Sequence, residues 1–220
     1  MNDLEKFFWK QSDRYIWKWT PYFKFYDKYF SKFRNKKCKI LEIGVYKGGS
    51  LQMWQNYFGQ DALIVGMDIN PECSAYSENK IEIFIGDQSS KVDLSKLVEK
   101  YGKFDVIIDD GSHVNEHQIA SFEYLIDYLN DDGVYLVEDT MGSYDLPDLP
   151  IENNFVSFAK KISNHLSDHF WNSEKHGLTK YTHCIEGVHF HFGMIFFEKS
   201  KFPIEKPSMI FSVGMRYQNK

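Results

Sequence analysis

The sequence predicts one α/β domain whose mostly parallel sheet has helices on both faces and is closed by an antiparallel hairpin. From Cys38 onward, short apolar runs alternate with amphipathic stretches, a rhythm typical of βαβ units. Near the end of the chain, two further apolar runs flank a short turn, which fits an antiparallel hairpin because parallel strands need a longer crossover. A length of 220 residues suits a single domain of this kind.

Each element is expected from its apolar pattern. Buried runs predict five strands at 39–43, 62–67, 81–85, 105–108 and 134–137. Helical spacing predicts the helices between them: one through Leu51, Trp54 and Phe58, then 94–101 and 116–129. A further helix is expected at 155–170, before hairpin strands at 185–190 and 194–198, and residues 145–150 are expected to form a long loop. These runs give a seven-stranded sheet.

Residues 1–37 form an N-terminal segment that is unlike the predicted domain at 38–220. The segment has ten Lys/Arg against four Asp/Glu, whereas the rest has 16 against 27. Thr20 is the expected N-cap and Pro21 the first residue of a helix. One face of that helix would be apolar: Tyr22, Tyr26, Tyr29, Phe30 and Phe33. We expect the face to dock on its own domain, with contact to a membrane surface or an anionic partner as the alternative.

Composition excludes several classes of protein. The sequence has no run of about eighteen apolar residues and no apolar signal-peptide core at its start, so neither a membrane span nor secretion is expected. Three cysteines without a C-x-x-C pair favour a reducing cytoplasm. The acidic body is unsuited to binding nucleic acid, because that affinity comes from basic residues.

Acidic residues follow nearly every predicted parallel strand. Ligands bind at the carboxyl ends of strands in such sheets, so these side chains share one rim. Helix capping explains one or two of them, but this many like charges on one rim would repel unless a cation were present. The seven are Glu42, Asp68, Asp87, Asp109, Asp110, Glu138 and Asp139.

The turn after the first strand, Glu42-x-Gly44-x-x-x-Gly48-Gly49-Ser50, suits a small ligand held close to the backbone. Its spacing matches neither the dinucleotide fingerprint nor a phosphate-cradling loop. Asp68 is placed to bond both hydroxyls of a ribose, and Asp87 with Gln88 could meet an adenine edge. Together these residues indicate an adenosine with an amino-acid tail, which is S-adenosylmethionine.

The motifs resemble those of a known family. Residues 40–50, Ile-Leu-Glu-Ile-Gly-Val-Tyr-Lys-Gly-Gly-Ser, resemble motif I of class I S-adenosylmethionine-dependent methyltransferases, which have a Rossmann-like fold. Residues 105–113, Asp-Val-Ile-Ile-Asp-Asp-Gly-Ser-His, and the later Val-Tyr-Leu-Val-Glu-Asp are similar to the metal-dependent macrolide and rhamnosyl sugar O-methyltransferases. The proteins labelled cephalosporin hydroxylase belong to the same group. The similarity runs from about Trp17 to Lys199.

The resemblance implies specific roles. Asp110, Glu138 and Asp139 would ligate Mg²⁺ or Mn²⁺, and three carboxylates at neighbouring strand ends independently suit such an ion. His113 would be the general base, and Tyr144 a substrate contact. Glu42 and Asp109 would orient the methionine portion of the cofactor. The full set of expected cofactor contacts is Glu42, Gly44, Tyr46, Ser50, Asp68, Asp87, Gln88 and Asp109.

The expected activity is methylation of a hydroxyl on a sugar or glycosylated small molecule, in polysaccharide or antibiotic biosynthesis. Two alternatives stay open. A catechol-type O-methyltransferase has Lys rather than His at the base position, and a non-catalytic S-adenosylmethionine-binding protein would keep the fold without turnover. No nucleic acid or membrane span is expected, and a homodimer through the N-terminal face is plausible. His165 and His169, four residues apart, more commonly form a solvated helix face than a zinc site.

Overall fold

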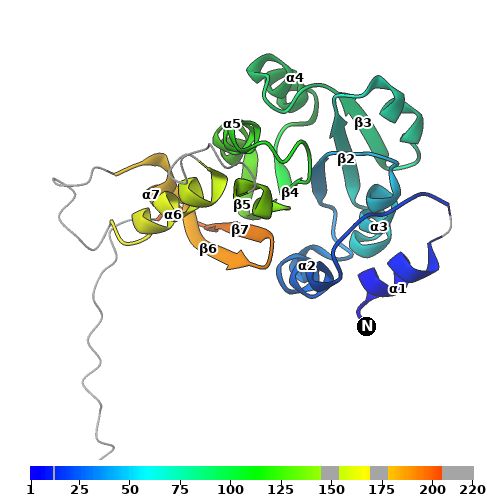
Figure 1. The fold of residues 1–220 in the computed structure, drawn as a ribbon, viewed down its shortest axis with the longest axis horizontal. Coiled ribbons are helices and arrows are strands. Elements are labelled where there is room, and N and C mark those ends of the chain that lie inside the picture. Colours follow the sequence, from blue (N-terminus) through cyan, green and yellow to red (C-terminus); the bar gives the residue numbers. More distant parts are fainter. Residues whose placement is uncertain (12, 145–153, 169–177, 205–220) are drawn as a thin grey trace, which may run out of the picture.

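A computed structural model describes residues 1–11, 13–144, 154–168 and 178–204 (Figure 1). Its centre is one seven-stranded sheet with the order β3-β2-β1-β4-β5-β7-β6. The strands are β1 (Lys39–Ile43), β2 (Leu63–Asp68), β3 (Ile81–Ile85), β4 (Phe104–Asp109), β5 (Leu129–Val137), β6 (Ile185–His191) and β7 (Met194–Lys199). The sheet confirms the predicted Rossmann-like methyltransferase fold.

The order of the strands creates the point at which a ligand can bind. β1 pairs in parallel with both β2 and β4, so the chain moves outward from β1 in one direction and then in the other. β5 continues the parallel part beside β4, and the β6–β7 hairpin closes the sheet antiparallel to β5. In open sheets, the crevice beyond the carboxyl ends of the strands at such a reversal is the usual ligand site. That crevice lies beyond β1 and β4.

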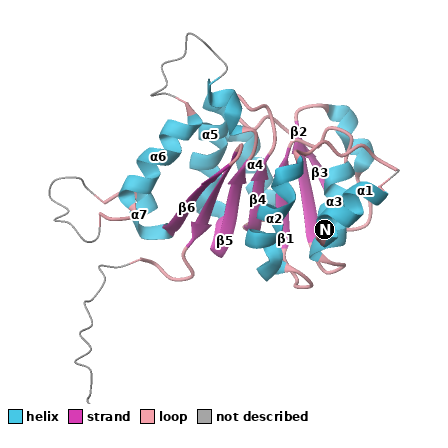
Figure 2. Cartoon of the chain, turned by 60° about the horizontal axis from the view of Figure 1, so that its bottom comes forward, coloured by secondary structure: helices cyan, strands magenta, loops and turns pink. Residues whose placement is uncertain are grey.

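Helices cover both faces of the sheet, which Figure 2 shows from a tilted view. One face carries α1 (Asp3–Lys10), α2 (Phe23–Phe30) and α3 (Gly49–Phe58), and the other carries α4 (Lys91–Tyr101), α5 (Asn115–Leu125) and α6 (Phe155–His165). The side chains of each central strand alternate between two cores, as the pleat requires. Ile40 belongs to the first core and Leu41 to the second, and Val106 and Ile107 divide in the same way.

The N-terminal segment packs on its own domain, as its apolar face predicts. All five aromatic residues of that face are buried and join the first core with Trp54 of α3 and Phe196 of β7. Tyr26 and Phe30 stack, and the ring of Trp54 meets both edge-on. The segment therefore forms part of the cover of the sheet.

Several predicted boundaries were wrong. Trp19, not Thr20, is the N-cap, and no side chain caps that end; the first turn, Thr20–Tyr22, is a 3₁₀ helix with Pro21 in it. The helix predicted to reach residue 129 ends as α5 at Leu125, because a 3₁₀ turn, Ile126–Tyr128, leads into β5. β5 therefore begins five residues before the predicted 134. Helix α6 ends at His165, and residues 145–150 and 170 lie outside the described residues.

The remaining elements are short. A 3₁₀ helix, Pro71–Tyr76, follows β2, another, Thr140–Tyr144, follows β5, and α7 (Lys180–Cys184) leads into β6. No helix in the described part of the chain is long and apolar enough to cross a membrane.

Candidate functional site

Two adjoining cavities lie beyond the carboxyl ends of β1, β2 and β4. The larger, about 570 Å³, is bounded by the turn after β1, the loops after β4 and β5, and residues 15–19 and 22. The smaller, about 230 Å³, lies between the ends of β1, β2 and β3. Gly44, Asp68 and Gly111 line both, so the two are parts of one cleft.

The turn after β1 is shaped to pass close to its neighbours. Gly44 has a φ of +92°, and a Cβ there would collide with the backbone carbonyl of Asp110, so glycine is needed for this approach. Asp68, at the end of β2, holds the turn in place. One of its carboxylate oxygens accepts hydrogen bonds from the backbone N–H groups of Val45 and Tyr46, at 2.8 and 3.2 Å. Asp68 thus anchors the turn while lining both cavities.

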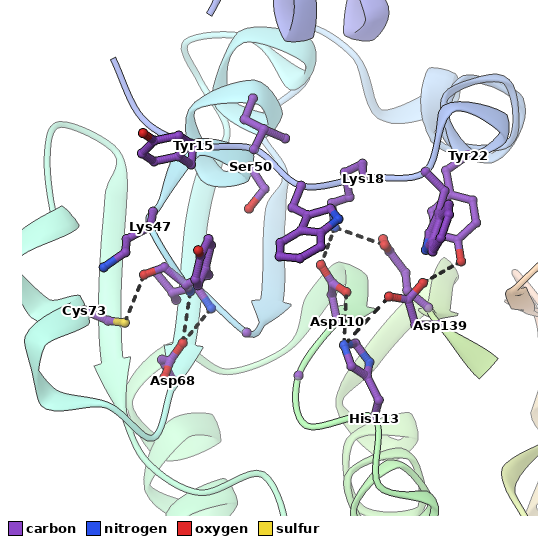
Figure 3. Close-up of a pocket in the computed structure, with 18 of the residues that line it drawn as sticks. Tyr15, Lys18, Tyr22, Lys47, Ser50, Asp68, Cys73, Asp110, His113 and Asp139 are labelled. Atoms are coloured by element: carbon purple, nitrogen blue, oxygen red, sulfur yellow. Dashed lines mark hydrogen bonds and ion pairs between the residues drawn. The ribbon is translucent and has the colours of Figure 1, made fainter. Parts of the chain in front are cut away.

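An outer cluster of Asp110, His113 and Asp139 lies at one end of the larger cavity (Figure 3). One ligand atom from each residue comes within 4.8 Å of the other two. His113 Nε2 lies 4.0 Å from Asp110 Oδ1 and 3.8 Å from Asp139 Oδ2. The second Asp139 oxygen accepts a 2.7 Å hydrogen bond from the Tyr22 hydroxyl, which orients that carboxylate.

The chemistry of this outer cluster fits a hard divalent cation. Carboxylate oxygens are the ligands that Mg²⁺ and Mn²⁺ prefer, and two of them face one imidazole here. His113 Nδ1 is buried and has no hydrogen-bond partner among the residues that the structure describes. Such an unsatisfied buried atom costs free energy unless a water or another bound molecule provides a hydrogen-bond partner.

Backbone strain concentrates at the cleft. Six described non-glycine residues have a left-handed backbone, and three of these line the larger cavity: Tyr46, His113 and Asp139, with φ of 51°, 58° and 52°. Each such residue costs about 1–3 kcal/mol, and residues of this kind concentrate where function requires an unusual side-chain direction. The strain at His113 and Asp139 directs both side chains into one cluster.

An inner cluster of Lys18, Glu42 and Glu138 is buried next to it. The Lys18 side chain is 2% exposed, and its Nζ lies 3.0 Å from Glu138 Oε2 and 3.5 Å from Glu42 Oε1. The same ammonium lies 2.5 Å from Asp110 Oδ2, so Asp110 joins the two clusters (Figure 3). Glu138 Oε1 accepts a 2.9 Å hydrogen bond from the Tyr26 hydroxyl.

Burial and charge set the protonation of the inner cluster. Burial alone would lower the pKa of Lys18, but the charges of Asp110, Glu138 and Glu42 outweigh it and raise the pKa well above its ordinary value. Lys18 therefore stays an ammonium ion at neutral pH. Burial raises the pKa of Glu42, and that of Glu138 more strongly, while the Lys18 charge acts in the opposite direction.

Glu42 and Ser50, both predicted cofactor contacts, bond to each other. Glu42 is fully buried and accepts hydrogen bonds from the Ser50 hydroxyl at 2.7 Å and from Trp54 Nε1 at 2.9 Å. Ser50 lines the larger cavity, as does Tyr46. The structure thus joins the start of α3 to the end of β1 through a buried carboxylate.

Asp87, Gln88 and Asp109 hold the loops around the smaller cavity. Asp87 accepts hydrogen bonds from Ser89, which lower its pKa. Gln88 donates to both oxygens of Asp109 at 3.1 Å and accepts from the backbone of Ser112. Asp87 and Gln88 line that cavity, whereas Asp109 is fully buried against Gln88 and Ser121. Asp109 therefore lies where it can support the loop after β4.

The other candidate residues are not members of the outer cluster. Tyr144 is exposed at the end of its 3₁₀ helix, beside residues that are not described. His117 lines the smaller cavity and contacts Ser112. His165 pairs with Asp168 at 2.6 Å, and position 169 lies outside the described residues.

Lys18 was missed by the sequence reasoning. It lies about ninety residues before Asp110 in an aromatic and basic segment, so no local motif links the two. One feature of the sequence did indicate such a residue. Seven acids on one rim require positive charge to offset their repulsion, and we assigned that charge to a metal ion alone. The N-terminal excess of Lys and Arg indicated that a basic side chain of that segment could supply part of this positive charge.

Comparison with known proteins gives a consistent set of relatives. Residues 41–140 match a methyltransferase-domain family. Demethylmacrocin O-methyltransferase of Streptomyces fradiae is 39% identical over 132 residues, covering 57% of this chain and 32% of the relative. Mycinamicin VI 2''-O-methyltransferase of Micromonospora griseorubida is 39% identical over 147 residues, covering 60% of this chain and 36% of the relative. The chain thus spans about a third of the length of these curated relatives.

A solved structure agrees over a longer stretch. The MycE methyltransferase of the mycinamicin pathway, in complex with Mg, S-adenosylhomocysteine and mycinamicin VI, matches 90% of this chain and 54% of its own. The TM-score is 0.79 and the identity 28%. The chain thus has the Rossmann-like methyltransferase fold and is similar, over part of its length, to sugar O-methyltransferases of antibiotic pathways.

Proposed function

We propose that the chain is an S-adenosylmethionine-dependent, divalent-metal-dependent O-methyltransferase that acts on a hydroxyl of a sugar or glycosylated small molecule. The observation that carries the proposal is the meeting of Asp110, His113 and Asp139 at a cavity beside the glycine-rich turn. The relatives support it, since their names describe O-methylation of glycosylated antibiotics and one was solved with Mg and S-adenosylhomocysteine.

The shape of the cleft suits the cofactor. The smaller cavity, lined by Asp87, Gln88 and His117, would receive the adenine, with Asp68 at the ribose between the two cavities. The amino-acid tail would then lie along Gly44, Tyr46 and Ser50 in the larger cavity, which is also the space left for the acceptor. Glu42, bonded to Ser50, and Asp109, bonded to Gln88, would hold this wall in position.

The metal ligands proposed are Asp110, Glu138 and Asp139, for Mg²⁺ or Mn²⁺. A divalent cation held there would supply positive charge that lowers the pKa of the acceptor hydroxyl. His113 Nε2 lies beside this charge and would take the hydroxyl proton as the acceptor oxygen attacks the sulfonium methyl group. Tyr144 would contact the acceptor from the loop after the metal ligands. Holding acceptor and cofactor together would supply much of the rate.

Lys18 does not serve as the base in place of His113. A catechol-type enzyme would need a neutral lysine near the metal ligands, and Lys18 lies 2.5 Å from Asp110. In the metal-free protein its surrounding carboxylates hold its pKa well above the ordinary value, so it already carries its proton. A lysine released from them is still an ammonium ion at neutral pH. This charge state favours His113 as base and the sugar-type reaction.

The proposal extends to the setting of the enzyme. The described residues contain three free cysteines, which supports a reducing cytoplasm. The substrate class supports a role in antibiotic or polysaccharide biosynthesis. Small-molecule acceptors, rather than nucleic acid, are the proposed partners, together with a second copy of the chain in a homodimer.

The metal requirement gives the decisive experiment. Transfer of a radiolabelled methyl group from S-adenosylmethionine to a panel of rhamnosides and deoxyhexose glycosides should stop in excess EDTA and return with Mg²⁺ or Mn²⁺. Calorimetry should show S-adenosylhomocysteine binding with and without metal. The Asp110→Asn/Asp139→Asn variant should lose turnover, whereas Asp131→Asn, at an exposed acid, should not.

Two results would contradict the proposal. Undiminished turnover in EDTA would show that the carboxylates serve only the structure of the loops. Cofactor binding without transfer to any acceptor in the panel would favour a binding protein without turnover.

A further inference from the structure

The N-terminal segment carries a charged side chain into the cleft on a short extended strap, defined here as residues 13–19. Side chains alternate along it: Tyr15, Trp17 and Trp19 are exposed, while Ile16 and Lys18 point inward. Tyr15 to Trp19 all line the larger cavity. The strap contains no helix or strand, so backbone ladders do not hold it.

The strap is attached to the domain mainly at its first residues. Arg14 donates a 3.1 Å hydrogen bond to the backbone carbonyl of Tyr76 and pairs with Glu78 at 3.3 Å. A Cβ at Gly49 would collide with the backbone of Tyr15, so glycine there lets the strap lie against the start of α3. Further along, Lys18 provides the ionic attachment, through its buried ammonium group.

Lys18 uses the oxygens that a metal ion would need. Both Glu138 oxygens are engaged, one by the Tyr26 hydroxyl and the other by Lys18, and Asp110 gives Oδ2 to the same ammonium. Only the Asp110 Oδ1 and Asp139 Oδ2 atoms face His113. A cation held by Asp110, Glu138 and Asp139 together therefore competes with Lys18 for Glu138 Oε2 and for the Asp110 carboxylate.

The balance of charge also indicates that Lys18 and a metal ion compete for the same carboxylates. Glu42, Asp110, Glu138 and Asp139 carry four formal negative charges when ionised, and Lys18 offsets one. Buried carboxylates are tolerated only with a partner of this kind. A divalent ion at Asp110, Glu138 and Asp139 would supply more positive charge to the same oxygens than an ammonium does, which weakens the hold on Lys18.

We propose that Lys18 and the divalent cation are alternative partners of Asp110 and Glu138, so that metal binding releases Lys18 and with it the inward contact of the strap. This inference rests on the proposed metal site. Because Trp17 and Trp19 flank Lys18 and line the larger cavity, the release also changes the wall that faces the acceptor. Metal loading and the shape of the acceptor side are thereby coupled.

Chemical labelling of the wild-type protein tests the displacement directly. A small acylating reagent followed by peptide mass spectrometry should leave Lys18 unmodified without metal, because its side chain is 2% exposed. Saturating Mg²⁺ should make Lys18 reactive. Lys47, which lines the same cavity and is exposed, should react equally in both states. Continued protection of Lys18 with Mg²⁺ bound would overturn the inference.

Metal affinity gives a second and independent readout. Mn²⁺ binding followed by electron paramagnetic resonance should be at least about tenfold tighter in Lys18→Met than in the wild type, or about 1.4 kcal/mol. Lys47→Met controls for a general charge effect and should change the affinity far less. Affinity in Lys18→Met equal to or weaker than in the wild type would contradict competition.

The two proposals fail in different ways. No Mn²⁺ binding in either protein would overturn the metal site of the proposed function, and this inference with it. Mn²⁺ binding to the wild type while Lys18 stays protected would overturn the inference alone. The labelling experiment needs no variant, so it decides the matter even if Lys18→Met does not fold.

Discussion

The inner and outer clusters hold the same type of side chain in opposite circumstances. Glu42 and Glu138 are 0 and 1% exposed, and their charges meet Lys18 within the protein. The side chains of Asp110 and Asp139 are 20 and 28% exposed and face His113 at the edge of a cavity. The fold therefore neutralises its buried acids with its own cation and leaves the outer acids available to a ligand.

This difference separates acids that stabilise the loops from acids suited to chemistry. A buried carboxylate without a counter-charge costs several kcal/mol, so Lys18 stabilises the inner pair. The side chains of Asp110 and Asp139 remain partly exposed to solvent, so they can bind an ion that enters the cavity. Asp110 belongs to both clusters, which makes it the place where folding and metal binding compete.

The largest expected effect concerns the outer cluster. Replacing His113 by Ala should lower the rate of methyl transfer by about 10²–10⁴, the range typical of a general base, because Nε2 is lost beside the metal ligands. Mn²⁺ affinity and S-adenosylhomocysteine binding should stay near the wild-type values. His165→Ala, which removes an imidazole on α6 that lines neither cavity, is the matched control for the rate. A parallel loss of Mn²⁺ affinity in His113→Ala would instead make His113 a metal ligand.

The next effect tests the dependence of the inner pair on Lys18. In metal-free protein, Lys18→Met should lower the free energy of unfolding by about 3–5 kcal/mol, because buried acids lose their counter-charge. Lys32→Met removes an ion pair with Asp132 at the surface and should cost less than about 1 kcal/mol. Denaturant titrations of both variants measure the contrast, and equal losses would contradict it.

The pH dependence of this variant has a defined sign. Burial raises the pKa of Glu42 and Glu138, so the folded state holds protons on them that the unfolded state releases. Protonation therefore stabilises the folded state, and this stabilisation is lost as pH rises through the folded-state pKa values. Without Lys18 to oppose the rise, Lys18→Met should regain stability as pH falls from neutrality toward 5. A loss of stability over that range would be inconsistent with buried acids as the cause.

The smallest expected effect is on the affinity for S-adenosylhomocysteine, at the end of the cleft proposed to bind the cofactor. Asp68→Ala should weaken S-adenosylhomocysteine binding by about 1–3 kcal/mol, since it removes a charged acceptor at the ribose position and frees the N–H groups of Val45 and Tyr46. Asp61→Ala, at an exposed acid before the start of β2, should leave the affinity unchanged. Calorimetry without metal keeps this end of the cleft separate from the carboxylate clusters. Equal affinity in both variants would remove Asp68 from the binding site.

The sequence by itself determined the fold and the position of the cleft. Apolar runs such as 62–67 and 105–108 read directly as strands, because a strand buried on both faces needs nearly every side chain to be apolar. Acidic residues follow these runs and mark the ends of the strands. Because the carboxyl ends of parallel strands lie at the same edge of the sheet, these acids are expected to lie near one another. Asp110, His113 and Asp139 could therefore be assigned to one site from local motifs.

Only the tertiary structure decided how those acids divide. Glu138 and Asp139 are neighbours in the sequence, yet Glu138 is buried beside Lys18, whereas Asp139, whose backbone is left-handed, faces His113 at the cavity. Lys18 reaches the acids of three strands from a segment whose aromatic helix docks on the sheet, a contact set by packing across about ninety residues. A local sequence pattern shows which face of a helix or strand is apolar. It does not show which charged side chain from a distant part of the chain is buried when that face packs.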